Sequence, residues 1–411
     1  MGPTIFISAG EASGEHYGAL LIQVLKRQLS ELGATASFIG MGGDRMAAEG
    51  LSRVVRSEDM AVMGITEVVR HLPRIYAEFR KLKRAARACR PDVAVLIDFP
   101  DIHFKLAAEF HRSGVPVIFF VSPQLWAWKK HRIKLVQKYV TKMLVIFPFE
   151  EPFYRARGVE AEFVGHPLVE LPLPRVSRTQ FADELGLDPD TVWIALLPGS
   201  RPKEIRANLP EMLEAAWMLV EHVWPHNREY RFLIPLAPTL NAEQRKEVRA
   251  LVEKRGDGLP IRLVEDARAA LFHSRVAVVA SGTATVEAAL IGNPFMVVYR
   301  VSPLTYAIAK RVVTVPHTAM ANLIAGRRVV PELIQKEFTA ANIVQQVDLL
   351  LPDGPPRQSM MQGLREVGRS LRAREAGSFG GYKGAIDRVA VVTLELVGAA
   401  LPASGHPVVQ S

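Results

Sequence analysis

The chain alternates short apolar runs with stretches of helical periodicity, and this alternation restricts its fold more than any other feature. Runs of four to six small, β-branched or aromatic residues are typical of strands buried on both faces of a parallel sheet. Helical patterns between such strands are typical of an α/β protein. We therefore predict two Rossmann-like, doubly wound parallel sheets, with strands at residues 4–8, 37–40, 93–98, 116–121, 143–147, 162–165, 192–197, 231–236, 261–264, 276–280 and 295–299.

A proline-rich stretch, HPLVELPLPR, interrupts this alternation near the middle of the chain and is predicted to be a linker. Its position divides 411 residues into two domains of ordinary size, 1–170 and 171–376. The carboxyl ends of the strands in each domain are expected to border a crevice that binds ligands. A final helix is predicted at residues 385–399, and the tail 400–411 is expected to be mobile.

Composition narrows the class of protein further. A hydrophobic content of 49% with 23% charged residues excludes disorder over most of the length. The single cysteine, Cys89, excludes an internal disulfide, and the first strand begins at Thr4 without a signal-like segment. No apolar run approaches the ~18 residues that span a bilayer. We therefore expect a cytoplasmic protein that is not integral to a membrane.

The net charge of +9 is concentrated in two segments. Residues 70–90 contain eight Lys and Arg and one acidic residue, and residues 129–142 contain six Lys and Arg and no acidic residue. Basic patches of this kind bind nucleic acid, anionic lipid or anionic substrates, although solvated helix faces have the same composition.

The stretch from Val276 to Pro294 predicts a strand, a tight turn at Ser281, Gly282 and Thr283, and a short helix that ends at Gly292. Such a turn directs unpaired N–H groups and the positive end of the helix dipole at one point, which suits a diphosphate. Glu287 cannot form a capping box, because the residue three positions before it is alanine. We expect its carboxylate to reach a ribose diol, the alternative being an ordinary turn with a solvated glutamate.

A second loop, Gly199, Ser200 and Arg201, follows the strand at 192–197. Glycine permits close backbone approach and arginine can bind two phosphate oxygens, so this loop is a second candidate wall of the diphosphate site. A surface arginine after a turn is the alternative.

In the first domain, Asp98 ends an apolar strand and is the candidate general base, because partial desolvation raises the pKa of a carboxylate. Asp101, three residues later, fits an N-cap or loop position better. Trp126 and Trp128 stand beside basic residues and suit a sugar ring or a lipid headgroup, whereas burial in the core is equally compatible with them.

Several classes lose support from missing motifs. The sequence contains no G-x-S-x-G, P-loop or H-E-x-x-H pattern, its eleven histidines show no metal-ligand spacing, and the glycine-rich segment after the first strand lacks G-x-G-x-x-G. Hydrolase, kinase, zinc-enzyme and nicotinamide-enzyme interpretations are therefore disfavoured.

Eight segments taken together resemble the lipid-A-disaccharide synthase family, in order and spacing from residue 5 to about residue 350. They are SAGEASGE (8–15), AVMGITEVV (61–69), VLIDFPDIHF (95–104), VSPQLWAW (121–128), FVGHP (163–167), LLPGSR (196–201), ASGTATVE (280–287) and NLIAGRRVVPELIQ (322–335). The resemblance implies a GT-B inverting glycosyltransferase that joins UDP-2,3-diacylglucosamine to 2,3-diacylglucosamine 1-phosphate through a β-1,6 linkage. It implies no metal, no cofactor beyond the UDP-sugar donor, and no nucleic acid.

The resemblance also assigns residues and partners. It implies that UDP is bound through Arg201, the Ser281 turn and Glu287 with Asn322 nearby, and that the acceptor lies near Asp98. It further implies a homodimer with exchanged C-terminal helices, in which the last helix, 385–399, packs on the layer of the first domain. The sequence departs from the family pattern at Glu15, where aspartate is usual, and at Ala321, where proline is usual. Two rivals are an enzyme similar to UDP-N-acetylglucosamine 2-epimerase and a non-enzymatic lipid-binding protein.

Because both substrates are lipids, we expect residues 68–87 to meet the anionic inner leaflet of the cytoplasmic membrane. Apolar residues recur here at helical spacing, and the main helix is predicted to start at Pro73. Leu82 and Ala86 are expected to be core. The residues expected to be exposed at the front end are Val68, Val69, Leu72, Ile75 and Tyr76.

Overall fold

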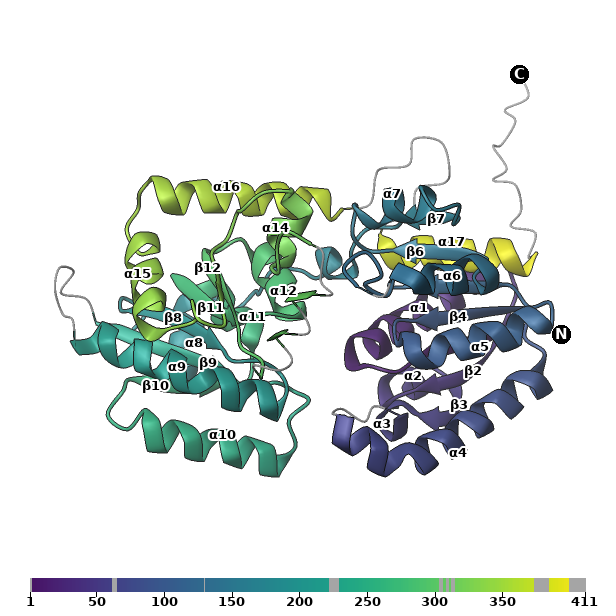
Figure 1. Ribbon diagram of the computed structural model, residues 1–411, viewed down its shortest axis with the longest axis horizontal. Coiled ribbons are helices and arrows are strands. Elements are labelled where there is room, and N and C mark those ends of the chain that lie inside the picture. The colour runs from purple at the N-terminus through teal and green to yellow at the C-terminus, as the bar shows by residue number, and fades with distance from the viewer. Residues whose placement is uncertain are drawn as a thin grey trace, which may run out of the picture. The chain divides into compact units, whose positions relative to one another are not determined.

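The computed structural model describes residues 2–60, 65–128, 130–221, 229–302, 306–307, 310–311, 315–372 and 384–398, with only the backbone of 65–72 and 130 (Figure 1). The predicted tail 400–411 lies outside these residues. The chain divides into two compact units, Met1–Pro167 with Leu371–Ser411, and Leu168–Ser370, called here the first and second unit. Each is described by itself.

The first unit contains a seven-stranded parallel sheet in the order β3-β2-β1-β4-β5-β6-β7. Its strands are β1 (Thr4–Ala9), β2 (Ser37–Gly42), β3 (Leu51–Arg56), β4 (Val93–Ile97), β5 (Val117–Phe120), β6 (Lys142–Val145) and β7 (Ala161–Phe163). Its helices are α1 (Ala12–Glu31), α2 (Asp44–Ala48), α3 (Ser57–Met60), α4 (Ile65–Cys89), α5 (Pro100–Arg112), α6 (Ile133–Tyr139), α7 (Glu150–Arg155) and α17 (Ala385–Val397).

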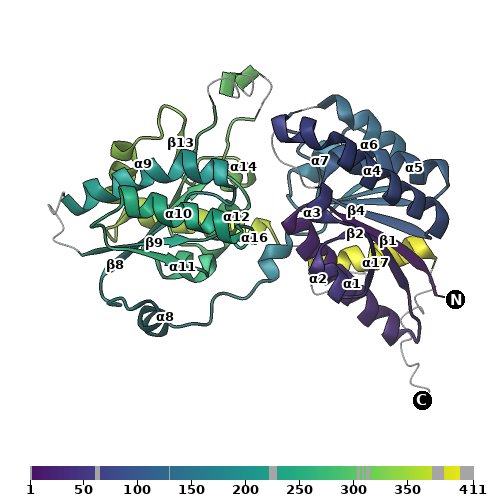
Figure 2. The same ribbon diagram turned by 90° about the horizontal axis from the view of Figure 1, so that it is seen from below.

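Both faces of this sheet are buried because side chains alternate along each strand. In β1, Ile5 and Ile7 join the core beneath α1 and α17, whereas Phe6 joins the core beneath α4 and α5. Figure 2 shows α1 and α17 on one side of the strands and α4, α5 and α6 on the other. The C-terminal helix α17 thus lies beside α1, near the start of the chain.

The second unit contains a six-stranded parallel sheet in the order β10-β9-β8-β11-β12-β13. Its strands are β8 (Val192–Leu197), β9 (Tyr230–Pro235), β10 (Ile261–Val264), β11 (Val276–Ala280), β12 (Phe295–Tyr299) and β13 (Glu332–Ile334). Its helices include α8 (Arg178–Leu185), α9 (Pro202–Glu221), α10 (Ala242–Arg255), α11 (Ala267–His273), α12 (Thr283–Ile291), α14 (Met320–Ala325), α15 (Ala340–Leu350) and α16 (Pro355–Ser370). Trp193 of β8 is buried against α8 and α11, on the side of the sheet opposite α9 and α10 in Figure 2.

The predicted α/β class, with two parallel sheets, is confirmed, and each of the eleven predicted strands overlaps an observed one. Two observed strands, β3 and β13, were not predicted. Both are edge strands, paired on one side only, and their sequences LSRVVR and ELI carry polar residues among few apolar ones. An edge strand tolerates this composition because part of it faces solvent.

The start of one helix differs from the prediction. Helix α4 does not start at Pro73 but passes through it, from Ile65. A proline inside a helix removes one backbone hydrogen bond, and a helix whose apolar face is otherwise packed can absorb that loss.

Candidate functional site

The two predicted loops of the diphosphate site lie where the strand order of the second sheet reverses. Strands β8 and β11 are neighbours, and β9 continues the sheet on one side while β12 continues it on the other. In open parallel sheets this switch point is where ligands bind, beyond the carboxyl ends of the two central strands. The loop Gly199–Arg201 follows β8 and the turn Ser281–Thr283 follows β11. The topology therefore brings both predicted walls of the diphosphate site to one edge of the sheet.

The loop after β8 is shaped by Glu204, in the first turn of α9. The Glu204 carboxylate accepts a hydrogen bond from the Ser200 N–H at 3.2 Å and pairs with Arg201 at 3.3 Å. Gly199 has φ +125°, and a Cβ there would lie 2.7 Å from the Glu204 side chain. The acidic side chain thus occupies the N–H and guanidinium groups that would bind a phosphate, and an incoming anion must compete with it.

The turn after β11 leaves the start of α12 open. The Ser281 N–H donates to the Val298 carbonyl at 2.9 Å, and Gly282, at φ +153°, is the N-cap. No side chain of the described residues caps α12, because the Thr285 hydroxyl donates to the Gly282 carbonyl at 2.7 Å instead. At its other end, Gly292 has the predicted left-handed conformation, with φ +86°. The exposed turn with its free N–H groups is a suitable site for an anion.

Glu287 lies in the second turn of α12 and is partly buried. Its nearest cation is Arg268, whose Nη1 lies 3.7 Å from Oε1. Burial raises the pKa of Glu287, and the Arg268 guanidinium opposes this effect. Arg268 is itself held by the Pro172 carbonyl, which accepts from Nη2 at 3.0 Å. Glu287 is therefore a desolvated carboxylate on the same helix as the anion site.

Asn322 lies elsewhere in the second unit, in α14, and its side chain is fully buried. Its amide oxygen accepts from the N–H groups of Val329 and Val330 at 2.7 and 2.9 Å. Its amide nitrogen donates to the Val330 carbonyl at 3.0 Å and to Glu332 at 2.7 Å. Glu332 in turn accepts from the N–H groups of Thr318 and Ala319 at the start of α14. The amide of Asn322 is thus committed to the packing of this helix against β13.

Asp98 occupies the corresponding switch point of the first sheet, where β1 and β4 are neighbours. Its backbone is left-handed, with φ 51°, and so are those of Phe99 (φ 52°) and Val121 (φ 63°) after the adjacent strand β5. Positive φ is uncommon outside glycine and is an outlier for a β-branched residue such as valine. Strained residues of this kind cluster at functional sites, where the surrounding structure over-determines them.

The environment of Asp98 suits a general base. Burial raises the pKa of its carboxyl group to about 6, the Glu11 carboxylate adds to the rise, and the Phe99 N–H opposes it. No lysine or arginine of the described chain forms an ion pair with Asp98. Asp101, by contrast, has a 69% exposed side chain paired with Arg132 at 2.6 Å. Of the two carboxylates, Asp98 is the desolvated one.

Behind Asp98 lies a buried chain of hydrogen bonds that the sequence interpretation missed. His103 of α5 and Ser8 of β1 are both fully buried. His103 Nδ1 lies 2.5 Å from the Asp98 carbonyl oxygen, and Nε2 lies 2.8 Å from the Ser8 hydroxyl. Burial lowers the pKa of His103 to about 4, so the ring is neutral near pH 7. Since a carbonyl only accepts, Nδ1 carries the proton and Nε2 accepts from Ser8.

The two tryptophans have different environments. Trp126 is buried and donates from Nε1 to Glu150 at 3.0 Å, whereas Trp128 is 42% exposed. The core interpretation therefore holds for Trp126, and Trp128 remains a candidate contact for a ligand. Glu15, the departure from the family pattern, accepts from the Arg45 N–H at 2.9 Å and so caps the short helix α2.

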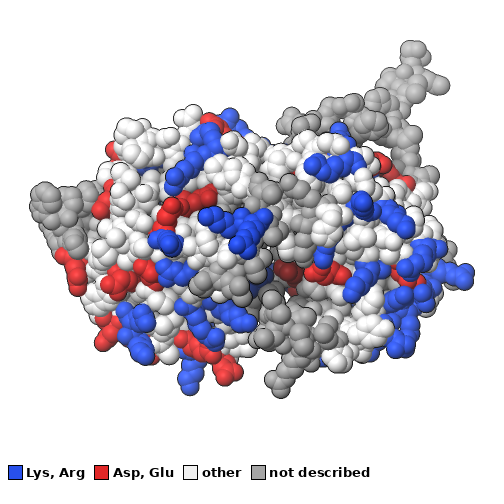
Figure 3. Space-filling view, in the orientation of Figure 1, with Lys and Arg blue, Asp and Glu red and all other residues white. Residues whose placement is uncertain are grey.

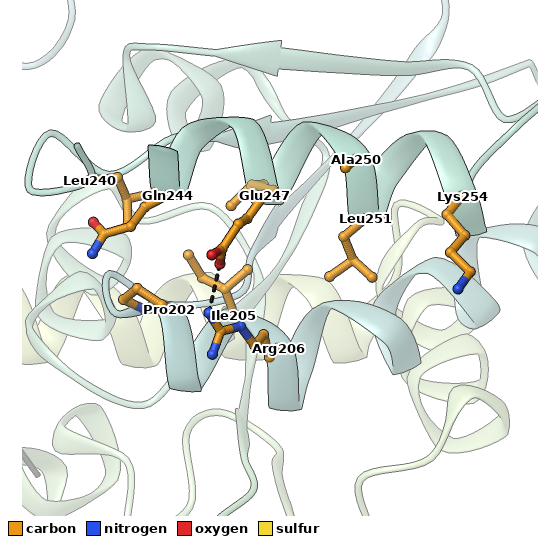
Figure 4. Close-up of a pocket in the computed structure, with 10 residues that line it drawn as sticks. Pro202, Ile205, Arg206, Leu240, Gln244, Glu247, Ala250, Leu251 and Lys254 are labelled. Carbon is orange, nitrogen blue, oxygen red and sulfur yellow. Dashed lines mark hydrogen bonds and ion pairs between the residues drawn. The ribbon is translucent and has the colours of Figure 1, made fainter. Parts of the chain in front are cut away.

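A separate cavity of about 400 Å³ lies between α9 and α10 in the second unit (Figure 4). Its walls are mostly apolar, and Arg206 and Glu247 form an ion pair across it at 2.6 Å. It begins at Pro202, next to Arg201, but none of the predicted site residues lines it. Arg206 and Glu247 neutralise each other, and Gln244 takes part in the capping box of α10. Lys254 is then the one remaining polar residue of the described lining, whereas a specific ligand site brings several polar groups together.

The exposure of side chains on α4 can be compared with the predicted membrane-facing stripe for part of the helix. Tyr76 is 62% exposed, and Leu82 and Ala86 are buried, as predicted. Ile75 was expected to be exposed, but it is partly buried because it packs against the core beneath the helix. The side chains of Val68, Val69 and Leu72 lie outside the described residues.

The described part of the chain contains no helix both long and apolar enough to cross a membrane. It also contains no group of three or more His, Cys, Asp or Glu side chains arranged to hold a metal ion.

Comparisons with known proteins agree with the fold and the resemblance. The family model described as lipid-A-disaccharide synthetase matches residues 5–378. The lipid-A-disaccharide synthase of Acidobacterium capsulatum is 60% identical over 378 residues, covering 90% of this chain and 92% of the relative. Among solved structures, MnaA of S. aureus with UDP has a TM-score of 0.62 at 14% identity, covering 96% of this chain and 97% of that chain. The calicheamicin glycosyltransferase CalG4 has a TM-score of 0.57 at 18% identity, covering 98% and 100%.

The two structural likenesses show the fold alone, a GT-B arrangement of two α/β units that glycosyltransferases and epimerases share. The family match extends over most of the sequence and distinguishes between these activities, so neither the epimerase nor the lipid-binding rival is favoured. With a family model matching from residue 5 to residue 378 and a relative 60% identical, this chain belongs to the lipid-A-disaccharide synthase family.

Proposed function

We propose that the chain transfers the diacylglucosaminyl group of UDP-2,3-diacylglucosamine to the 6-hydroxyl of 2,3-diacylglucosamine 1-phosphate. The acceptor oxygen forms a bond to the anomeric carbon, the bond from that carbon to the diphosphate breaks, and the configuration inverts. Asp98 takes the proton of the hydroxyl, and UDP leaves with the bonding electrons. The observation that supports this best is a desolvated carboxylate, with a pKa of about 6, at the switch point of the first sheet.

In this proposal the second unit binds the donor. The diphosphate takes the place of Glu204 at Arg201 and at the Ser200 N–H, and Gly199 lets it approach the backbone. The open start of α12 at Ser281, Gly282 and Thr283 binds the other phosphate oxygens. Glu287 accepts hydrogen bonds from the ribose hydroxyls. Asn322 acts indirectly, by fixing α14 against β13.

The acceptor is assigned to the first unit, beside Asp98. The exposed Trp128 lies in the loop after β5, next to β4 in the sheet, and Arg132 of the same segment pairs with Asp101 beyond the end of β4. An aromatic face and cationic groups suit a glucosamine ring that carries a phosphate.

The central test is Asp98→Asn, with Asp101→Asn as the matched control. Removing a general base typically lowers the rate by ~10² to 10⁴, so Asp98→Asn should lose turnover and keep its affinity for UDP. The measurement is formation of radiolabelled disaccharide, with calorimetry of UDP binding on the same sample. Normal turnover in Asp98→Asn with a dead Asp101→Asn would show that the wrong carboxylate was chosen. Product formed without the second lipid would contradict the transferase assignment itself.

The donor site is tested by Glu287→Ala. Loss of a charge-assisted hydrogen bond should cost ~1.5 to 3 kcal/mol of UDP binding. Glu243→Ala is a suitable control, because Glu243 lies in the first turn of α10, on another helix of the same unit. Equal UDP affinity in the two variants, both folded, would contradict the ribose assignment.

We also propose that residues 68–87 bring the chain to the anionic inner face of the cytoplasmic membrane. Figure 3 shows lysines and arginines gathered over the part of the first unit where Figure 1 places α4, α5 and α6. Several are already paired, among them Lys83 and Arg87 with Glu109. Arg80 and Arg84 are exposed, and neither forms an ion pair with an acidic residue of the described chain. Each arginine is worth ~1 kcal/mol of binding near an anionic surface.

The membrane proposal is tested by sedimentation with anionic vesicles at low salt. The variant combines Tyr76→Ser with Arg80→Gln and Arg84→Gln, and should bind more weakly than the parent. Tyr306→Ser is the matched control, because Tyr306 is an exposed tyrosine of the second unit. Undiminished binding of the triple variant would contradict the assignment to α4.

The homodimer with exchanged C-terminal helices is a further part of the proposal. Helix α17 packs on the first unit of its own chain here, and an exchange would preserve that apolar contact while changing only the chain that supplies the helix. Sedimentation equilibrium of the intact protein measures the assembly directly, and a monomer at micromolar concentration would contradict it.

A further inference from the structure

Two hydrogen bonds hold the main chain of Asp98. The Asp98 N–H donates to the Phe120 carbonyl of β5 at 2.9 Å, which is part of the sheet. Its carbonyl lies 2.5 Å from His103 Nδ1, five residues along the chain. Asp98 itself has φ 51°. Its side chain therefore leaves the backbone in a different direction from that of a residue in an extended strand.

Ser8 of β1 fixes the protonation of His103, and with it the hydrogen bond from His103 to the Asp98 carbonyl. The Ser8 hydroxyl, fully buried, lies 2.8 Å from His103 Nε2. A hydroxyl that donates to Nε2 keeps the proton on Nδ1, where it is needed for the Asp98 carbonyl. Ser8 lies near the end of β1, in register with Leu96 of the adjacent strand β4. Asp98 follows Ile97, the last residue of β4. The chain of hydrogen bonds therefore crosses the switch point of the first sheet.

Packing around Phe99 supports the same conformation. A Cβ on Gly10 would lie 2.3 Å from the Phe99 ring, so the ring rests directly on the glycine backbone after β1. The ring also meets His103 edge-on, with centroids 5.8 Å apart. The left-handed residues Asp98 and Phe99 are thus packed between His103 of α5 and Gly10 in the loop after β1.

We propose that His103 and Ser8 are positioning residues for the transfer reaction, holding the Asp98 main chain left-handed so that its carboxylate is aimed at the acceptor hydroxyl. This inference rests on the proposed role of Asp98. Neither residue touches the substrate or exchanges a proton with it. A displacement of about 1 Å in a catalytic group can lower the rate ~10²-fold. We therefore expect loss of either residue to lower kcat and to leave UDP affinity unchanged.

Two substitutions of His103 separate its two hydrogen bonds. His103→Asn keeps a donor near the position of Nδ1 and loses the contact with Ser8. His103→Gln keeps an acceptor near the position of Nε2 and loses the donor to Asp98. We expect His103→Gln to lower kcat at least 10-fold and His103→Asn to restore most of it, with UDP affinity unchanged in both. His111→Gln, at the exposed end of the same helix, is the control and should leave kcat unchanged.

The pH profile gives a readout that a merely structural role would not move. The groups that face the Asp98 carboxylate are the Glu11 carboxylate and the Phe99 N–H, and neither is altered by these variants. The parent should gain kcat/KM as pH rises through about 6, the pKa of Asp98. In His103→Gln the Asp98 carboxylate should become more solvated, which lowers its pKa. The rise in kcat/KM should then occur at a lower pH than in the parent.

The outcomes are distinct. Equal kcat and an equal acidic limb in the parent and in folded His103→Gln would overturn the inference. Equal losses in the Gln and Asn variants would overturn it as well, because the Asp98 bond would then not be the decisive one. Should His103→Gln not fold, Ser8→Ala takes its place: a two-fold to 10-fold loss of kcat supports the proposal, and parental kinetics refute it. An active Asp98→Asn would contradict the proposed base itself, whatever the His103 variants do.

Discussion

Asp98→Asn should make the protein more stable while it abolishes turnover. Burial raises the pKa of Asp98 from 3.8 to about 6, so the folded chain binds a proton more tightly than the unfolded chain does. The parent therefore loses stability as pH rises from about 4 to about 6, and above that range it carries the full cost of a desolvated charge. Asparagine has no charge to desolvate.

The magnitude follows from linkage. At about 1.4 kcal/mol for each pH unit between the two pKa values, the ionised carboxylate costs ~3 kcal/mol at pH 8. Asparagine is nearly the same size and is among the residues that tolerate positive φ, so the substitution adds little strain at φ 51°. The expected gain is ~3 kcal/mol at pH 8 and close to zero at pH 4. For a unit of this size it corresponds to roughly 6 to 12 °C in melting temperature.

Calorimetric melting at pH 8 and at pH 4 measures the difference, and hydrogen exchange of β4 and β5 peptides assigns it to the first unit. Two separate units make a single unfolding free energy for the whole chain ill-defined, so the exchange data carry the quantitative comparison. Asp101→Asn is the control. It removes an exposed ion pair with Arg132 and should change stability by less than ~1 kcal/mol. A gain in Asp98→Asn that is the same at both pH values, or no gain at pH 8, would refute the reasoning.

Three further substitutions test the packing described above. Gly10→Ala places a methyl group against the Phe99 ring and should destabilise the first unit by ~1 to 3 kcal/mol while lowering kcat, as measured by melting and by initial rates. Leu82→Ala removes a fully buried side chain of α4 and should cost ~2 to 5 kcal/mol in denaturant unfolding, so a neutral result would mean that this end of α4 is not core. Asn322→Ala leaves two buried N–H groups unpaired at ~1 to 3 kcal/mol each and should lower the melting temperature of the second unit; a direct role in UDP binding would instead appear as lost affinity in a fully folded variant.

Local signals accounted for much of the fold. Strands β8 and β11 have the bounds expected for continuous apolar runs, because a strand covered on both faces has no reason to alternate polar with apolar residues. Gly292 ended its helix in the left-handed conformation as predicted, since glycine and a following proline leave few alternatives. The edge strands β3 and β13 were not predicted, because a strand that is partly exposed to solvent need not contain a continuous apolar run.

The candidate site divides in the same way. The sequence by itself determined the class of fold and the family. It also singled out Asp98, Arg201 and Ser281 as candidates, because each follows an apolar run typical of a strand. Only the tertiary structure decided that His103 and Ser8, 95 residues apart, share a hydrogen bond, and that Glu204 already occupies the donors of its loop. Strand order places these groups together. That order is set by how helices cover both faces of a sheet, which no local pattern of residues encodes.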